Sequence, residues 1–480
     1  MTAGRMIRFA FPNATAILLC LSAIAAAQPL AFTHVTVIDA TGRPPMPNRT
    51  VVVVGDRIQS IGETGKLRTP TGTRIVDAAG KFLIPGLWDM HVHFRGGAAL
   101  IPDNESWLRL FVANGITGIR EMGGDIAPTV FQWRAEIAKG TRLGPRIVTS
   151  GPKVDGAKPA WEGSLTVTDA ESARDAVRQL KAMGADFVKI YGPDFAHDTF
   201  AALLEEARRQ NLAVAGHLPL DTHTVRECIE AGVKSIEHID FNLLPGCSRL
   251  EGHFLEGPGL LYGLATLADT FDPEWAQELI ARMVQRGTWA TPTLAAGLLI
   301  QTMGRVDYDR DPRRKYIFPG IWKTWDPASP RNVRQPFAGD SERNWQRIRK
   351  QSVVLLRMLQ AGGVGLLAGS DCGAWNNFTF PGWTLHQELA LMVESGLTPI
   401  EALQAATRNP ARYFGELERA GTVEAGKVAD LILLNADPLA DIRNTAKIDA
   451  VLLRGRLLER AALDTLLADV AKAAAGSVTP

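Results

Sequence analysis

The sequence has few cysteines, no excess of charge of either sign and only one long apolar run. Four cysteines in 480 residues are too few for the disulfide framework of a small secreted domain. The 52 basic and 51 acidic residues nearly cancel, which argues against a nucleic-acid partner or an anionic membrane surface. With 46% hydrophobic and 21% charged residues, the chain has the composition of a globular protein, not of a disordered or fibrous one.

The long apolar run lies at the N-terminus and predicts an export signal over residues 1–27. Arg5 and Arg8 precede the uncharged segment Ala14–Ile24, and the small residues Ala25–Ala27 follow it. This order is typical of a secretory signal peptide. The segment is shorter than the roughly 20 residues that a helix needs to cross a bilayer, so we expect cleavage and not a membrane anchor. The mature protein is then exported, periplasmic or secreted, with no membrane contact beyond the signal.

Short β-rich runs lie at both ends of the mature chain. Near the start they are Phe32–Asp39, Thr50–Val54 and Arg57–Ile61, and near the end they are Ala429–Leu434, Ala450–Leu453 and Arg456–Leu458. Apolar runs that are separated by turn residues are typical of strands. We therefore expect one small β-sandwich domain assembled from both termini, over residues 28–84 and 416–480.

Residues 85–415 show short apolar runs that alternate with helix-period segments such as Ala170–Met183 and Phe200–Gln210. The eight runs have the length of strands: Leu87–His93, Gly115–Met122, Pro145–Ser150, Phe187–Tyr191, Ala213–His217, Ser235–Asp240, Thr288–Leu294 and Val364–Ser370. Eight strands interleaved with helices predict an α/β fold, a (β/α)8 TIM-like barrel. The connection Ile300–Ser341 has no clear period, and we expect a lid or an excursion over one face there.

Two histidines mark the end of the first predicted barrel strand. In the run Asp89-Met90-His91-Val92-His93, the side chains of His91 and His93 lie on one face because strand residues alternate with a period of two. Imidazole nitrogens are ligands suited to zinc. Taken alone, such a pair also occurs where two histidines simply pack.

Further polar residues fall on the ends of later strands. His217 ends the fifth predicted strand, His238 lies near the end of the sixth, and Asp371 follows the eighth. The carboxyl ends of barrel strands form the active site, so these side chains would meet the first two histidines at one rim. Burying that many unpaired polar groups would be costly, and a joint metal site accounts for all of them.

Lys189 lies in the apolar fourth strand, FVKIY, where a bare ammonium is expensive to bury. Addition of carbon dioxide to its amine would give a carbamate, an anionic oxygen donor that can bridge two cations. The alternative is a lysine whose amine reaches a rim or pairs with an acid. Tyr191 lies on the same face of the strand by alternation.

The other histidines, cysteines and basic residues receive structural interpretations. We expect His34 in the terminal sandwich, His197, His223 and His253 in solvent, and His386 in a packing or capping role on a helix; Cys228, Cys247 and Cys372 are expected to be structural. The basic residues of the long connection could hold a substrate carboxylate, but a solvated loop is the favoured interpretation for Arg305, Arg310, Arg313, Arg314 and Lys315.

Taken in order, the motifs resemble the amidohydrolase superfamily over essentially all of the mature sequence. VTVIDATG and VVVVGDRIQSIG begin the resemblance, IPGLWDMHVHF carries the metal motif, FVKIYG, AGHLP, IEHID and GSD follow, and GTVEAGKVADLILLNADPLADI ends it. The Lys-Ile-Tyr strand and Gly-His-Leu-Pro resemble the exported metal-dependent dipeptidases and N-acyl amino acid hydrolases, a branch related to imidazolonepropionase.

The resemblance implies a role for each candidate residue. His91, His93 and Asp371 would bind the first, more buried zinc ion, Lys189 as a carbamate would bridge two ions, and His217 and His238 would bind the second. Tyr191 resembles the tyrosine that polarises the scissile carbonyl in this branch. Without carbamylation of the lysine the site would hold one metal, as in the imidazolonepropionase-like and deaminase branches.

The expected activity is hydrolysis of an amide C–N bond in a small molecule, a dipeptide or an N-acyl amino acid. Metal ions lower the pKa of bound water towards ~7, and Asp371 can take its proton and later deliver it to the departing amine. The second metal and Tyr191 would stabilise the oxyanion. Trp375, Asn376 and Asn377 follow Asp371 and are placed to line the substrate side.

Other functions stay open on the sequence. The same site could serve a single-metal cyclic amidase or deaminase, or an esterase, lactonase or phosphotriesterase. An exported binding protein without catalysis is a further alternative, against which the complete ligand set argues. The exact substrate is open because barrel specificity depends on the loops after the strands. The oligomeric state is open too, a homo-oligomer included.

Overall fold

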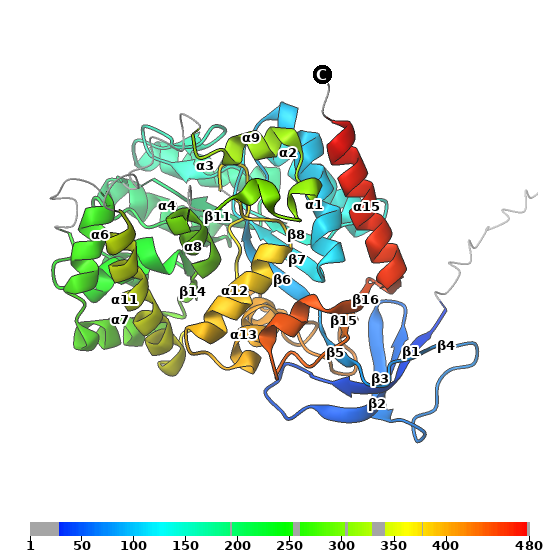
Figure 1. Ribbon diagram of the computed structural model, residues 1–480. Coiled ribbons are helices and arrows are strands. Elements are labelled where there is room, and N and C mark those ends of the chain that lie inside the picture. The colour runs from blue at the N-terminus through cyan, green and yellow to red at the C-terminus, as the bar shows by residue number, and fades with distance from the viewer. Residues whose placement is uncertain are drawn as a thin grey trace, which may run out of the picture.

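The computed structural model describes residues 28–192, 194–252, 260–302, 306–328, 341–376 and 378–477. The predicted export signal lies outside these ranges, as do His253, Arg305 and Asn377. Figure 1 shows a mixed α/β molecule, with helices around a central group of strands and the N-terminal strands gathered at one end. Within the described ranges, no helix combines the length and the apolarity that crossing a bilayer requires.

Strands from both ends of the chain share one eight-stranded sheet, in the order β17-β16-β15-β5-β1-β2-β3 with β4 on β1. Its members are β1 (Leu30–Val37), β2 (Met46–Val54), β3 (Arg57–Glu63), β4 (Arg74–Asp77), β5 (Phe82–Pro85), β15 (Leu431–Leu434), β16 (Ile448–Leu453) and β17 (Arg456–Glu459). The two ends join where β15 runs antiparallel to β5, with Leu433 opposite Leu83. Both leucines belong to a separate buried cluster. The two-layered sandwich itself, and its domain limits, stay a prediction.

Two parallel sheets occupy the centre of the molecule. One consists of β6 (Leu87–Val92), β7 (Ile116–Glu121) and β8 (Arg146–Thr149). The other has the order β10-β9-β11-β12-β13-β14, made of β9 (Val154–Asp155), β10 (Leu165–Thr166), β11 (Phe187–Ile190), β12 (Ala213–Gly216), β13 (Ser235–Glu237) and β14 (Trp289–Thr291). The first seven predicted runs of the central region therefore each contain a strand.

The eighth predicted strand, Val364–Ser370, is wrong as an element. This segment and the residues after it form only isolated parallel bridges, from Leu366 to β14 and from Cys372 to β6. A Cβ atom on Gly365 would lie 2.2 Å from the Trp289 ring, and one on Gly369 would lie 2.7 Å from the Cβ of His91. The glycines let the backbone pass close to both neighbours, and glycine weakens a regular strand.

The sixth predicted strand is shorter than expected. β13 ends at Glu237, and a π-helical turn, Ile239–Leu243, follows. His238 between them has φ 62°, a left-handed conformation that a strand does not allow. The seventh predicted strand also ends early, because a helix begins at Leu294.

Helices follow most of the central strands and cover them (Figure 1). They are α1 (Ile101–Ala113), α2 (Ala127–Lys139), α3 (Ala170–Met183), α4 (His197–Arg209), α5 (Val225–Ala231), α6 (Leu260–Asp269), α7 (Pro273–Arg286), α8 (Leu294–Thr302), α9 (Pro319–Trp325), α11 (Ser341–Ala361), α12 (Trp383–Glu394), α13 (Pro399–Ala405), α14 (Arg408–Tyr413) and α15 (Arg460–Gly476). α3 has the predicted bounds because Asp169 caps its N-terminus and Gly184, at φ 82°, ends it.

The described part of the long connection is more regular than its sequence indicates. It contains α9, whose Trp325 is fully buried and donates a hydrogen bond from Nε1 to the carbonyl of Gly373 at 2.9 Å. This contact ties the connection to the loop that follows Asp371. Residues 303–305 and 329–340 of the connection lie outside the described residues, and its role as a lid stays a prediction.

Candidate active site

Three predicted ligands converge at the end of β6. His91 and His93 approach each other with Nε2 atoms 3.2 Å apart. The Asp371 carboxylate lies 3.2 Å from Nε2 of His93 and 3.5 Å from Nε2 of His91. Their ligand atoms all lie within 4.8 Å of one another, and no other trio of histidine, cysteine or acidic residues in the described chain does so. The arrangement is that of a divalent metal site with nitrogen and oxygen ligands.

Each of the two paired histidines is fixed by a hydrogen bond through its other ring nitrogen. Nδ1 of His91 lies 2.8 Å from a carboxylate oxygen of Glu237, and Nδ1 of His93 lies 2.8 Å from the carbonyl oxygen of Gly123. Both acceptors require a proton on Nδ1, which leaves Nε2 as the lone-pair donor. Burial lowers the pKa of both imidazoles, so both are neutral and ready to ligate.

Glu237 is itself held by Arg120, a fully buried arginine on β7. Nη2 of Arg120 donates to both Glu237 carboxylate oxygens at 2.8 Å, and Nε donates to the carbonyl oxygen of Met90 at 2.6 Å. Burial alone would raise the pKa of Glu237, but the charge of Arg120 and the hydrogen bond to His91 outweigh it and hold that pKa below its usual range. Glu237 therefore stays ionised beside His91.

His217 and His238 lie next to this cluster. The ring of His238 is 4.7 Å from that of His91 and 4.6 Å from that of His217, centre to centre. Nδ1 of His238 lies 2.7 Å from the hydroxyl oxygen of Thr293. The backbones of His238, Thr293 and Asp371 all have positive φ values, of 62°, 52° and 54°. Such conformations cost about 1–3 kcal/mol each and persist where the surroundings enforce them, often at active sites.

Lys189 lies on β11 with its side chain fully buried. Its Nζ atom has no hydrogen-bond partner among the described residues. Gly216 on the neighbouring β12 gives the chain room, because a Cβ there would lie 2.9 Å from Cδ of Lys189. Burial is the largest influence on the amine and lowers its pKa from 10.5 to about 8. Because Nζ has no partner among the described residues, Lys189 does not form the alternative ion pair with an acid there.

Tyr191 and Asn376 border the cluster. The Tyr191 ring lies 4.3 Å from the ring of His217, and burial raises its phenol pKa, so the hydroxyl keeps its proton. Nδ2 of Asn376 donates to the Asp371 carboxylate at 2.8 Å, and its amide oxygen accepts a hydrogen bond from Arg95 at 2.6 Å. Trp375 lines a cavity on this side.

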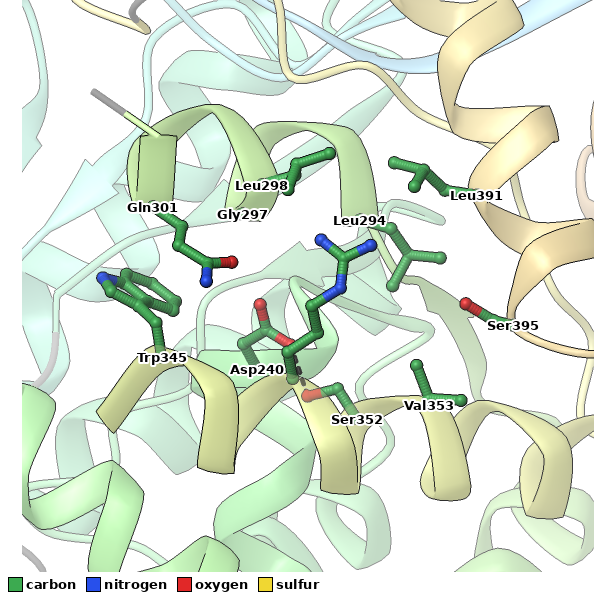
Figure 2. Close-up of a pocket in the computed structure, with 11 residues that line it drawn as sticks. Asp240, Leu294, Gly297, Leu298, Gln301, Trp345, Ser352, Val353, Leu391 and Ser395 are labelled. Carbon is green, nitrogen blue, oxygen red and sulfur yellow. Dashed lines mark hydrogen bonds between the residues drawn. The ribbon is translucent and has the colours of Figure 1, made fainter. Parts of the chain in front are cut away.

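A second, smaller cavity lies beside Asp240 and is too small for a substrate. Figure 2 shows it between α8, α11 and α12, with Asp240 accepting a hydrogen bond from Ser352. Its volume is about 20 Å³, which is room for little more than one water molecule. We therefore assign no binding role to it.

Several site residues escape sequence reasoning, notably Glu237, Arg120, Arg95 and Lys153. One feature of the sequence could have identified Glu237: it is a charged residue inside an apolar predicted strand, directly before His238. A charge in such a place needs a partner. The interpretation of His223 as solvated is wrong: it is buried and stacks on His197 with ring centres 4.1 Å apart. His386 packs as expected, with hydrogen-bond contacts to Thr445 and the carbonyl of Asn114, and the three described cysteines are buried and free.

Known proteins resemble this chain over most of its length. The model of the Amidohydrolase family matches residues 82–458. Ochratoxinase from Aspergillus niger is 24% identical over 467 residues, covering 83% of this chain and 80% of the relative. A structure of a Xaa-Pro dipeptidase with bound methionine has TM-score 0.64 and 21% identity, covering 90% of this chain and 100% of the other. The bottromycin amidohydrolase structure has TM-score 0.68 and 22% identity, with coverages of 92% and 90%.

The breadth of the family match decides the assignment. It spans the paired histidines of β6, Lys189, both later histidines and Asp371, and it extends into the C-terminal strands of the eight-stranded sheet. Members of the family generally depend on a metal, and the convergent His91, His93 and Asp371 fit one. The chain belongs to the amidohydrolase family and is a hydrolase of carbon–nitrogen bonds.

Proposed function

We propose that the protein hydrolyses the amide bond of dipeptides or N-acyl amino acids. The observation that carries this proposal is the convergence of His91, His93 and Asp371 beside a buried lysine amine that has no hydrogen-bond partner among the described residues. Neutral imidazoles, a carboxylate and a modifiable amine form a donor set suited to zinc. We propose that the ion is zinc and that the site binds two of them.

The chain's own residues divide the work of hydrolysis. A divalent ion supplies Lewis acidity and lowers the pKa of water towards ~7 when it is bound. Asp371 accepts the proton from the attacking water and later passes it to the departing amine nitrogen. The Tyr191 hydroxyl donates a hydrogen bond to the carbonyl oxygen as negative charge develops there. Asn376 holds the Asp371 carboxylate in place for both proton transfers.

We propose further that Lys189 carries a carbamate. The neutral amine adds to carbon dioxide, forming an N–C bond and releasing one proton, so the product is an anionic oxygen donor. A pKa of about 8 supports this step, because a sizeable share of the amine is neutral near pH 7 to 8. His217 and His238 would then share a second ion with the carbamate oxygens.

The fold and location that accompany this function are part of the proposal. The central strands β6 to β14, closed by the segment Val364–Ser370, would form a (β/α)8 barrel over residues 85–415. Met90 supports the closure, because its N–H donates to the carbonyl of Ala368 at 2.9 Å. The terminal sheet would form the accompanying sandwich, and the mature enzyme would be exported after loss of residues 1–27.

A substrate screen on zinc-loaded mature protein tests the proposal. We expect turnover of dipeptides or N-acyl amino acids and little turnover of esters and lactones. Ester or lactone hydrolysis without amide hydrolysis would contradict it. Metal analysis on the same sample separates the two forms of the site, because one tightly bound ion per chain would favour a single-metal enzyme over the carbamate-bridged pair.

A further inference from the structure

A cavity lined by basic side chains lies beside the cluster formed by His91, His93 and Asp371. Its volume is about 90 Å³, and its lining residues are Arg95, Gly124, Asp125, Lys153, Trp161, Glu162 and Trp375. The two basic side chains are the most buried members of this lining, with exposed fractions of 3% for Arg95 and 2% for Lys153. Trp161 is half-buried and Glu162 is exposed. The cavity is therefore positive inside.

Lys153 faces this cavity without a charged partner. Among the described residues it donates no hydrogen bond and forms no ion pair, and its Nζ lies 4.8 Å from the ring centre of Trp161 and 5.9 Å from that of Tyr191. Burial, followed by the charge of Arg95, lowers its pKa well below the usual value. Among the acidic side chains, Glu121 attracts the Lys153 amine most strongly, but the two do not form an ion pair. The lowered pKa favours the neutral amine while the cavity is empty, and a bound anion would stabilise the charged ammonium instead.

The backbone makes room for this lysine. Gly123 has φ 91°, and a Cβ atom there would lie 2.6 Å from Cγ of Lys153. The carbonyl oxygen of the same glycine accepts the hydrogen bond from His93. One glycine therefore both accepts the hydrogen bond that orients a predicted metal ligand and leaves room for the Lys153 side chain.

The acidic residues of the lining do not cancel its charge. The Asp125 carboxylate is already engaged, since its two oxygens accept hydrogen bonds from the backbone N–H groups of Gly96 and Gly97 at 2.8 and 3.0 Å. Glu162 stands at the exposed edge. Arg95 is anchored by Ala374 and Asn376 and stacks on Trp161 at 3.6 Å. Lys153 is thus the cation with room for a ligand.

The cavity also connects with the reacting groups. Asn376 links the Arg95 guanidinium to the Asp371 carboxylate by two hydrogen bonds. Tyr191 packs edge-on against Trp161 with ring centres 6.2 Å apart, and Trp375 lies 6.1 Å from Trp161. An anionic group that contacts Lys153 would place an attached amide near both Tyr191 and Asp371, and the indole faces would border its apolar part.

We propose that Lys153, supported by Arg95 and bordered by Trp161, is a binding site for a substrate carboxylate and selects substrates that end in one. This inference takes from the proposed function only that the bond to be cleaved is an amide. Lys153 would donate a hydrogen bond to the carboxylate that a dipeptide or an N-acyl amino acid carries next to its amide nitrogen. The same class of compound lacking that charge would bind without this contact.

The site can be tested without catalysis by measuring the binding of two compounds that the enzyme cannot hydrolyse, one with a carboxylate and one without. Calorimetry on the zinc-loaded protein compares 3-phenylpropanoate with the neutral 3-phenylpropan-1-ol, for the wild type, K153M and K153R. We expect K153M to bind the carboxylate about 10- to 100-fold more weakly, as loss of a charged hydrogen bond predicts, and the alcohol unchanged. K153R should keep most of the preference. Lys158 is exposed in the same loop, so K158M should behave as the wild type.

Several outcomes would overturn the proposal. Equal losses for acid and alcohol, or no loss for either, would show that Lys153 is structural. Absence of any preference for the acid in the wild type would do the same. If K153M fails to fold by circular dichroism, K153R decides, because a preserved preference needs the cation. A protein that binds the acid through Lys153 but hydrolyses no amide would refute the proposed function and leave this site standing.

Discussion

In the proposed mechanism, Asp371 both binds the metal and transfers the proton. It lies 3.2 Å from Nε2 of His93 and accepts a hydrogen bond from Asn376. We predict that D371N lowers kcat by about 100- to 10,000-fold, because an amide cannot take the water's proton. The amide oxygen can still accept from Asn376, so the fold should persist. Steady-state kinetics with circular dichroism and metal analysis measure both parts.

The control for this substitution is D464N, which removes an exposed acid of α15. It should leave kcat unchanged. If D371N retained wild-type turnover, Asp371 could not be the proton shuttle. If it lost its metal together with its activity, the ligand role and the proton role would have to be separated by adding zinc in excess.

Arg120 contacts the site through Glu237, which lies beside Nδ1 of His91, and not through the Nε2 atoms proposed to bind the metal. We predict that R120M destabilises the fold by about 3–5 kcal/mol, because it leaves the buried Glu237 charge without its partner. Urea unfolding monitored by fluorescence measures this. R310M, at an exposed pair with Asp307, is the matched control and should cost about 0–1 kcal/mol. A small effect of R120M would mean that Glu237 finds another way to be neutralised.

At the residue scale, the sequence predicted what depends on local spacing. The alternation of His91 and His93 and the position of His217 after β12 are each visible in a single short window. Asp371 was expected at the end of an eighth strand, but the segment before it forms only isolated bridges. The Glu237–Arg120 pair is not, since its members are 117 residues apart and only the fold brings them together. A buried acid next to a predicted ligand hints at a partner, but its identity depends on tertiary contacts.

At the element scale, the pattern of apolar residues predicted where the strands lie more accurately than where they end. β6 and β11 lie where apolar alternation predicts them, because local preference and burial agree there. Val364–Ser370 reads as a strand from its apolar residues, yet Gly365 and Gly369 meet bulky neighbours and reduce it to bridges. The early end of β13 at Glu237 follows from the left-handed His238. Both deviations occur at the candidate site, where strained backbone is expected.

A buried acid of α12 contacts the first turn of α8. Glu388 accepts a hydrogen bond from the backbone N–H of Ala295 at 2.7 Å, and burial raises its pKa from 4.5 to about 8. The folded state holds this proton more tightly than the unfolded chain. Its contribution to stability is therefore complete below pH 4.5 and is lost as the pH rises through about 8, at up to ~1.4 kcal/mol per pH unit.

We predict that E388Q flattens this part of the pH profile, because a glutamine cannot ionise. The variant should be clearly more stable than the wild type at pH 8.5 and similar to it at pH 5. Thermal unfolding from pH 5 to 9 measures the difference. E205Q, an exposed substitution on α4, should follow the wild-type profile. Parallel profiles for E388Q and the wild type would mean that Glu388 is already ionised in the folded state.

At the scale of the whole molecule, the sequence predicted the general class of fold and its use of both chain ends. β15 to β17 complete a sheet that begins with β1 to β5, as the similar texture of the two ends indicates. The helices after residue 300 were harder to foresee, because α9 has only seven residues and depends on the burial of Trp325. Short helices gain little from local preference and form through tertiary packing.

Metal removal tests the molecule as a whole, because the ligands come from strands and loops spread over residues 91–371. We predict that exhaustive chelation abolishes hydrolysis and lowers the melting temperature, since an ion present at 100 times its dissociation constant stabilises a fold by about 2.7 kcal/mol. Zinc should restore both. H34Q, which removes an exposed histidine of the terminal sheet, should respond to chelation as the wild type does, whereas H93A should show no metal-dependent shift. Full activity after chelation would mean that His91, His93 and Asp371 meet for a reason other than holding a metal, and the proposed hydrolysis would lose its basis.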